Sequence, residues 1–299
     1  MAHIYTNYLT AFQRLEGAYA PNTIKSYYAD VKHFVDWSVV IEVQPLPLSN
    51  TTLTRYIESM QFTHRYATIL RKLVAIKKVN ELLGYPQVEY STEFHLTLRR
   101  IRRGQSAERR QARGINQDLL MRMINAQSDD LFGIRNRALL SLGYDFLARR
   151  SELVALKRDD IEFLGDGSLR AVIRRSKTDQ FGRGRLVYGS TRSAELLSAW
   201  LKHLSFDATW IFCPIKRQTP KPEPLCCRSV SDIIKAAVIK TRGERPREYE
   251  ISGHSLRVGA AQDLLISGHD LAAIMRAGGW TSVRVVSDYL RHAEHNIWA

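Results

Sequence analysis

The sequence predicts a mainly α protein of two domains, with a small antiparallel β-hairpin or sheet in the second domain. Its 299 residues, 44% of them hydrophobic, are enough for two ordinary domains that each bury a core. Apolar residues recur at helical spacing through much of the chain, whereas two short β-rich runs flank a polar turn in the second half. A strongly basic segment separates the two parts.

The N-terminal part is predicted to form a compact helical domain over residues 1–104. Asn22 and Thr23 can cap a helix whose apolar residues recur at helical spacing over residues 27–35. Further helices are expected at residues 51–60 and 67–83, the second of which ends before a glycine. The apolar faces of these segments would form one core.

Seven arginines and a single acidic residue lie between Arg99 and Arg113, with glycines as breaks. We place a linker at residues 105–114. A run of this kind is either a solvated linker or a strap that crosses DNA phosphates, and the net charge of the chain favours the strap. The candidate DNA contacts are Arg99, Arg100, Arg102 and Arg103.

The charge balance favours a large polyanionic partner. Lysine and arginine total 44 against 30 acidic residues, which gives a formal net charge of +14. DNA or RNA would fit this charge, and an anionic membrane surface would exert the same attraction. No run approaches the ~20 apolar residues that a spanning helix needs, and the first ten residues do not resemble a secretion signal. We therefore expect a cytoplasmic protein that binds no membrane.

Three cysteines, two of them adjacent, are a poor basis for disulfide bonds and suit a reducing compartment. The sequence contains neither a CxxC pair nor an HExxH motif. A structural zinc site is therefore not expected, and any chemistry would be done by side chains or with a diffusible metal. We also expect no bound metal, no cofactor and no small-molecule substrate.

The second domain, over residues 115–299, combines helices with a short β segment. A hairpin is expected where LRAVIR (residues 169–174) and RLVY (residues 185–188) flank a turn that begins near Lys177. Residues 214–224 are rich in proline and are predicted to form an exposed loop. Helices are expected at residues 117–125, 135–146 and 229–240.

Four short patterns in this domain carry functional information. His254 and Arg257 lie three residues apart, so a helix would place their heads on one face, although this pattern alone would more often be structural. Arg149 and Glu152 occur where a helix would begin. Trp280, in a Gly-Gly-Trp sequence, follows Arg257 by 23 residues, and Tyr289 follows Trp280 by nine.

The strings SGHSLRVGAAQDLL and IMRAGGWTSVRVVSDYL resemble the C-terminal motif of the tyrosine recombinase, or phage integrase, family. The likeness continues through LARRSELVALKRDDI and RRSKT, and more faintly through LRRIRR, so it covers essentially the whole chain. It implies a two-domain DNA clamp, in which a helical core-binding domain precedes the catalytic domain. It also implies an enzyme that cuts and rejoins duplex DNA through a covalent phosphotyrosine, acting as a homotetramer on two inverted-repeat sites.

The resemblance also assigns roles by matching position. Arg149 and Arg257 would bind the scissile phosphate, Tyr289 would be the nucleophile, Lys177 the lysine of the hairpin, and His254 the histidine before the second arginine. Trp280 would occupy a position that many members fill with histidine, and either bond a phosphate oxygen or pack as a core aromatic. Glu152 would orient Arg149 or His254. Arg228 matches a position that faces the major groove, where arginine commonly reads guanine, although a phosphate contact or a surface role is equally open.

These residue types suit the chemistry. In-line attack on a phosphodiester builds negative charge on the non-bridging oxygens, and two guanidinium groups can stabilise that charge without a metal. Because a phenol is mostly protonated at neutral pH, its proton must leave as it attacks, and His254 is the candidate to assist. Lys177 is the candidate donor to the leaving 5′ oxygen. Two other functions remain open: a type IB topoisomerase-like enzyme and a catalytically silent DNA-binding accessory factor.

Overall fold

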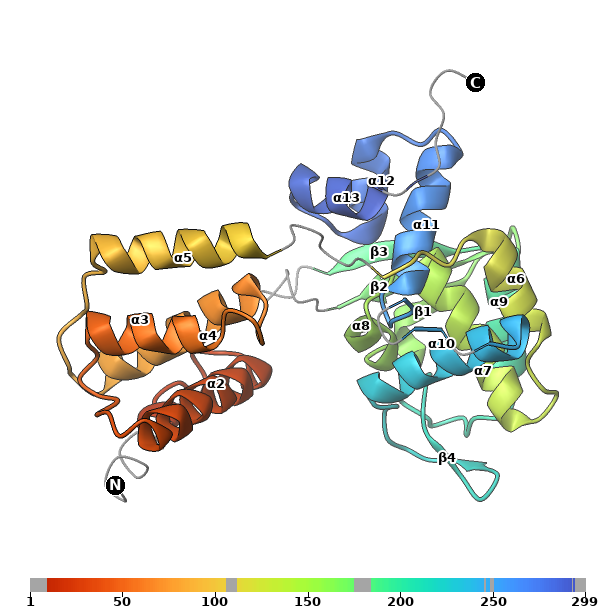
Figure 1. The fold of residues 1–299 in the computed structure, drawn as a ribbon. Helices are drawn as coiled ribbons and strands as arrows, with labels where there is room; N and C mark the ends of the chain where they lie inside the picture. Colours follow the sequence, from red (N-terminus) through yellow and green to blue (C-terminus); the bar gives the residue numbers. More distant parts are fainter. Residues whose placement is uncertain are drawn as a thin grey trace. The chain divides into compact units, whose positions relative to one another are not determined.

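The computed structural model describes residues 10–105, 112–174, 184–244, 246–247, 250–291 and 293 (Figure 1). The chain divides into two compact units, Met1–Glu108 and Arg109–Ala299. This division falls inside the segment predicted to be the linker, most of which lies outside the described residues. The linker bounds therefore stay a prediction, and each unit is described by itself.

The first unit is a bundle of helices. Its core contains large side chains that are almost fully buried, among them Phe34, Tyr56 and Phe94. Ser49 and Ser91 cap two of the helices by accepting hydrogen bonds from the N–H groups of residues three positions later. The helices are α2 (Pro21–Val40), α3 (Asn50–Ser59), α4 (Tyr66–Leu82) and α5 (Thr92–Gly104).

The start of α2 differs from the prediction. The helix begins at Pro21 and its N-cap is Ala20, so neither Asn22 nor Thr23 is the cap. Proline has no N–H group to leave unpaired and its φ angle already suits a helix, so it is favoured in the first turn. Pro21 is therefore the signal that marks the start of α2.

The basic run also differs from the prediction, because its first half is helical. Phe94, Thr97 and Ile101 are buried along one face of α5 at helical spacing. Arg99, Arg100, Arg102 and Arg103 are exposed on the same helix. These four arginines thus lie on a regular helix of the first unit, and their contact with DNA phosphates stays a prediction.

The second unit combines helices with two small antiparallel sheets. β1, β2 and β3 form one sheet in that order, and Ala171 of β2 pairs with Val187 of β3. β4 and β5 form the second sheet. The elements are α6 (Gln117–Asn125), α7 (Leu131–Asp145), α8 (Arg150–Val154), the 3-10 helix η1 (Arg158–Asp160), β1 (Ile161–Phe163), β2 (Leu169–Ile173), β3 (Arg185–Gly189), α9 (Thr191–Leu201), β4 (Ile215–Lys216), β5 (Thr219–Pro220), α10 (Cys227–Arg242), α11 (Ser255–Ile266), α12 (Leu271–Gly278) and α13 (Val283–Leu290).

The predicted mainly α fold with a small antiparallel sheet is confirmed, and so is the hairpin of β2 and β3. The interpretation of residues 214–224 as a plain loop was wrong, because β4 and β5 form a short hairpin there. Its tip residues, Arg217 and Gln218, adopt positive φ angles of 51° and 59° without being glycine, so the usual turn signal is missing. No helix within the described part of the chain is long and apolar enough to cross a membrane.

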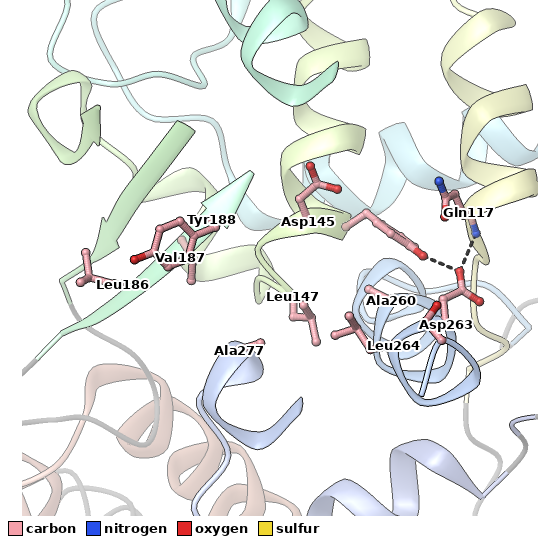
Figure 2. Close-up of a pocket in the computed structure, with 12 residues that line it drawn as sticks. Gln117, Asp145, Leu147, Leu186, Val187, Tyr188, Ala260, Asp263, Leu264 and Ala277 are labelled. Carbon is pink, nitrogen blue, oxygen red and sulfur yellow. Dashed lines mark hydrogen bonds between the residues drawn. The ribbon is translucent and has the colours of Figure 1, made fainter. Parts of the chain in front are cut away.

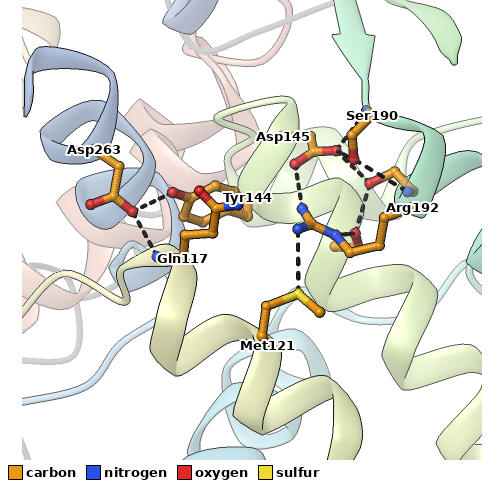
Figure 3. Close-up of polar contacts among 9 residues, drawn as sticks. Gln117, Met121, Tyr144, Asp145, Ser190, Arg192 and Asp263 are labelled. Atoms are coloured by element: carbon orange, nitrogen blue, oxygen red, sulfur yellow. Dashed lines mark hydrogen bonds and ion pairs between the residues drawn. The ribbon is translucent and has the colours of Figure 1, made fainter. Parts of the chain in front are cut away.

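A polar network fixes the C-terminal end of α7 (Figure 3). The carboxylate of Asp145 accepts hydrogen bonds from the Ser190 N–H (2.8 Å), the Ser190 hydroxyl (2.6 Å) and Nη2 of Arg192 (2.9 Å). On the other side, the hydroxyl of Tyr144 donates to Asp263, on α11. The chain that leaves α7 at Phe146 is therefore anchored both to the start of α9 and to α11.

Candidate active site

Arg257 lies at the centre of the candidate site and is completely buried, on the third residue of α11. Its guanidinium group donates to the main-chain oxygen of Leu147 and, at 2.7 Å, to that of Gly278. Burial, and next the positive charge of Arg149, lower the pKa of Arg257 to about 10. The side chain therefore stays positively charged at neutral pH.

Glu152 joins two further arginines. Its carboxylate is fully buried and accepts hydrogen bonds from Nη1 (2.6 Å) and the main-chain N–H (3.0 Å) of Arg149, and from Nη2 of Arg185 (3.0 Å). Burial alone would raise the pKa of Glu152, but the amide hydrogen bond and the two guanidinium groups outweigh it, so the pKa is lowered. Glu152 is thus an ionised bridge between Arg149, the N-cap of α8, and Arg185, the first residue of β3.

Arg185 was not predicted as a site residue. Its side chain is only 14% exposed, and its Nη1 donates to the main-chain oxygens of Phe146 (3.2 Å) and Ala277 (2.5 Å). Burial lowers its pKa, as it does for Arg257. The only signal in the sequence was a basic residue at the start of a predicted strand, which is common on protein surfaces.

The described side chains of the site carry an excess of positive charge. Arg149, Arg185 and Arg257 are three guanidinium groups, and the carboxylate of Glu152 binds two of them, Arg149 and Arg185. The Nε atoms of Arg185 and Arg257 are buried and have no hydrogen-bond acceptor. Because buried charge is costly unless it is paired, the excess of three guanidinium groups over one carboxylate favours the binding of an anion.

The Gly278-Gly279-Trp280 turn is shaped by close packing. A Cβ atom on Gly278 would lie 1.9 Å from the ring of Trp280, and one on Gly279 would lie 2.7 Å from Cδ of Arg185. Gly279 also has a φ of +65° as the C-cap of α12, which side chains rarely adopt. Because both positions are glycine, the Trp280 ring can pack against Gly278 and the Arg185 side chain can lie against Gly279.

The ring of Trp280 contacts both Arg257 and Tyr289. The guanidinium carbon of Arg257 lies 4.1 Å from the centre of the Trp280 ring, which is buried. The ring of Tyr289, on α13, lies 5.0 Å from that of Trp280 at an angle of 61°, and 5.9 Å from the guanidinium carbon of Arg257. Nε2 of Gln262 donates to the main-chain oxygen of Tyr289 at 3.1 Å. In the described contacts, Trp280 packs as an aromatic of the core.

Three further residues were predicted for the site: His254, Arg228 and Lys177. His254 is exposed at the N-cap of α11, where its main-chain N–H donates to the Ser252 hydroxyl at 3.1 Å. Arg228 lies in the first turn of α10, is 90% exposed and pairs with Asp232 at 3.9 Å. Lys177 lies outside the described residues.

A hollow of about 300 Å³ opens beside the site (Figure 2). Leu147 and Ala277, whose main-chain oxygens hold Arg257 and Arg185, are two of its lining residues. Leu147 has a φ of +46°, which is strained for a residue with a side chain. Strain of this kind persists only where the surroundings enforce it, and the Arg257 hydrogen bond is part of that enforcement. The other lining residues come mainly from the end of α7, from β3 and from α11.

No cluster of three or more histidine, cysteine or acidic side chains that could hold a metal ion occurs in the part of the chain that the structure describes. The three cysteines are not bonded to one another.

Comparison with known proteins supports the family resemblance of the sequence motifs. A family model described as the phage integrase family matches residues 114–296, which is more than half of the chain. An integrase/recombinase XerD homologue of Selenomonas ruminantium is 29% identical over 94% of this chain and 85% of its own length. The recombinase Cre of Escherichia phage P1 is 28% identical over 76% of this chain and 71% of its own length.

Solved structures share the fold. A structure of the XerH site-specific recombinase bound to a palindromic difH substrate, in a post-cleavage complex, superposes with a TM-score of 0.67. The alignment covers 91% of this chain and 76% of that one at 18% identity. Given the family match over its second unit and the relatives along its length, this chain belongs to the phage integrase family and is a tyrosine recombinase.

Proposed function

We propose that this chain is a site-specific DNA recombinase that cleaves and rejoins duplex DNA through a 3′-phosphotyrosyl intermediate on Tyr289. The observation that carries the proposal is the position of the Tyr289 ring, 5.9 Å from the guanidinium group of Arg257, beside a site with excess positive charge. An anion held by Arg149 and Arg257 would lie within reach of the phenol. A DNA phosphodiester fits this combination of anion site and oxygen nucleophile.

The reaction exchanges one phosphodiester for another, so it needs no external energy source. The phenolic oxygen of Tyr289 forms a bond to phosphorus while the bond between phosphorus and the 5′ oxygen breaks. His254, one residue before α11, takes up or relays the phenolic proton, and Lys177 donates a proton to the 5′ oxygen. The guanidinium groups stabilise the added negative charge on the non-bridging oxygens. Attack of a 5′ hydroxyl from a second duplex reverses the step and gives strand exchange through a Holliday junction.

The proposed partner is duplex DNA with an inverted-repeat site, on which four protomers join two duplexes. The net charge of +14 supports a polyanionic partner. The similarity to XerH, whose structure contains a palindromic DNA substrate, supports an inverted repeat. Arg228, exposed in the first turn of α10, remains our candidate for base contact.

Recombination between two sites on one plasmid tests the proposal. We expect the purified protein to give recombined product from a plasmid that carries two copies of its site, with EDTA present throughout. Arginines can provide the stabilisation that a metal would otherwise supply, so chelation should leave the rate unchanged. The measurement is the yield of recombined plasmid on a gel against time.

Other outcomes identify other functions. Relaxed plasmid without recombined product would indicate a type IB topoisomerase-like enzyme. Bound but uncut DNA would indicate an accessory factor, and cleavage that stops in EDTA and returns with magnesium would indicate a metal-dependent nuclease. A plasmid without the sites serves as the control.

The exposed arginines of α5 predict a steep dependence of DNA affinity on salt. Each neutralised phosphate contributes about 0.9 to the slope of log affinity against log salt concentration. Changing Arg99, Arg100, Arg102 and Arg103 to alanine together should flatten that slope by about two to four. Titrations of labelled DNA at several salt concentrations measure it.

The Tyr289→Phe variant should keep the wild-type slope, because it removes no charge, and it serves as the control. Arg100 already pairs with Glu93 at 2.8 Å, so its single replacement should contribute least of the four. An unchanged slope in the fourfold variant would show that this face of α5 does not meet DNA phosphates.

A further inference from the structure

We propose that Arg185 is a positioning residue that locks Arg149 and the Gly278-Gly279-Trp280 turn into one unit. The inference rests on the proposed function, because it assigns Arg185 a role in the reaction of Tyr289. It concerns a residue at the start of β3 that contacts three separate segments of the second unit. Three kinds of contact made by Arg185 support this proposal: with Glu152, with two main-chain oxygens and with Gly279.

The first contact is with Glu152. Oε1 of this carboxylate accepts from Nη1 of Arg149, while Oε2 accepts from both the Arg149 N–H and Nη2 of Arg185. Without Arg185, the buried carboxylate would face a single guanidinium group and would lose one of its three donors. The orientation of the Arg149 side chain would then be less restricted.

The second contact bridges two segments that are distant in sequence. Nη1 of Arg185 donates to the main-chain oxygens of Phe146, just after α7, and Ala277, in the last turn of α12. Arg257 makes the adjacent bridge, from Leu147 to Gly278. Two arginines therefore bind consecutive carbonyl groups on each side, and together they hold the end of α12 against the end of α7.

The third contact is steric. The stem of Arg185 passes so close to Gly279 that a Cβ there would lie 2.7 Å from Cδ and 2.9 Å from Nε. Trp280 follows directly, and its ring packs on both Arg257 and Tyr289. The Arg185 side chain therefore restricts the conformation of the turn that precedes Tyr289.

These contacts distinguish positioning from direct catalysis. A guanidinium group has five N–H donors, and three of those of Arg185 are directed at protein acceptors. Its Nε is buried, which keeps that donor away from a bound phosphate. Arg185 therefore acts on the reaction through Glu152 and the turn.

The test compares Arg185→Ala and Arg185→Lys with Arg170→Ala. Arg170 is the matched control, because it pairs with Glu162 at 2.7 Å on the same sheet but at the solvent-exposed surface. At saturating DNA we expect the rate of adduct formation on a nicked substrate to fall about 10- to 100-fold in Arg185→Ala, with partial recovery in Arg185→Lys. DNA affinity should stay within about twofold of wild type, and Arg170→Ala should match the wild type in both measurements.

Two further measurements detect positioning itself. The losses from Arg185→Ala and Glu152→Gln should not multiply in the double variant, because the two residues act as one unit. The amides of Gly279 and Trp280, which bond to Arg276 and Met275, should exchange hydrogen faster in Arg185→Ala than in Arg170→Ala. If Arg185→Ala does not fold, Arg185→Lys gives the comparison, because it keeps a positive charge beside Glu152 but has fewer donors for the carbonyl groups.

A wild-type cleavage rate in Arg185→Ala would overturn the proposal. So would fully multiplicative losses with Glu152→Gln, which would mean that Arg185 acts on the substrate by itself. If the wild-type protein forms no adduct at all, the proposed function fails. Amide exchange would then still report whether Arg185 holds the turn, so the two failures remain distinguishable.

Discussion

Changing Tyr289 to phenylalanine should abolish covalent capture of DNA while leaving folding and DNA binding intact. The substitution removes one oxygen and keeps the ring that packs on Trp280 at 5.0 Å. Since we assign bond formation to this hydroxyl alone, no other group can replace it. The measurement uses a nicked suicide substrate, which traps the protein on the 3′ end of the cut strand in a denaturing gel.

Tyr188→Phe is a suitable control, because Tyr188 is exposed on β3 in the same unit. It should form the adduct at the wild-type rate. Adduct formation by Tyr289→Phe, or a wild-type linkage to the 5′ end, would contradict the mechanism.

Loss of an arginine proposed to bind the scissile phosphate is the second large effect. Changing Arg257 or Arg149 to alanine should slow adduct formation by two to three orders of magnitude, because each removes transition-state hydrogen bonds worth about 3 to 4 kcal/mol. The single-turnover rate at saturating DNA measures this loss, and binding affinity should change far less. A rate within threefold of wild type would remove that arginine from the mechanism.

The residual activity of Arg257→Lys should depend on pH. Burial and the neighbouring Arg149 lower the pKa of Arg257 to about 10, which still leaves it charged below pH 9. A lysine starts from a lower reference pKa, so the same surroundings would bring it toward neutrality. Its charged form is lost as pH rises, so the residual activity of Arg257→Lys should fall between pH 7 and 9. The wild type should show no loss from this residue over that range.

The sequence predicted the helices well where apolar periodicity was long. The β2 and β3 hairpin was predicted from its β-rich runs, and α6 has the expected bounds of Gln117–Asn125. β1 was missed because three residues are too few to show a period. The arginine run hid the end of α5, since its buried residues, Phe94, Thr97 and Ile101, are spaced among charges. In the prediction of this segment, the density of arginines was given more weight than the helical spacing of the buried residues.

The candidate site was predictable only in part. The motifs named Arg149, Glu152, Arg257, Trp280 and Tyr289, whose side chains the structure connects through shared contacts. Their roles in catalysis stay predictions. Arg185 was not predicted because its partners are main-chain oxygens and a carboxylate from distant segments. Every residue has a main-chain oxygen, so the residue types in the sequence do not indicate such contacts. His254 and Arg257 share a motif but differ sharply in exposure, which spacing alone does not reveal.

The carbonyl anchors of Arg185 and Arg257 also bear on the order in which function is acquired during synthesis. They join the chain after α7 to the end of α12, so they cannot form until residues 277 and 278 have left the ribosome. Contacts of such long sequence separation are late events in folding. The arginines of α5 are made much earlier. A nascent chain can therefore fold the basic helix well before it can hold Arg185 and Arg257 in place, so the proposed DNA binding would be acquired earlier than the proposed cleavage.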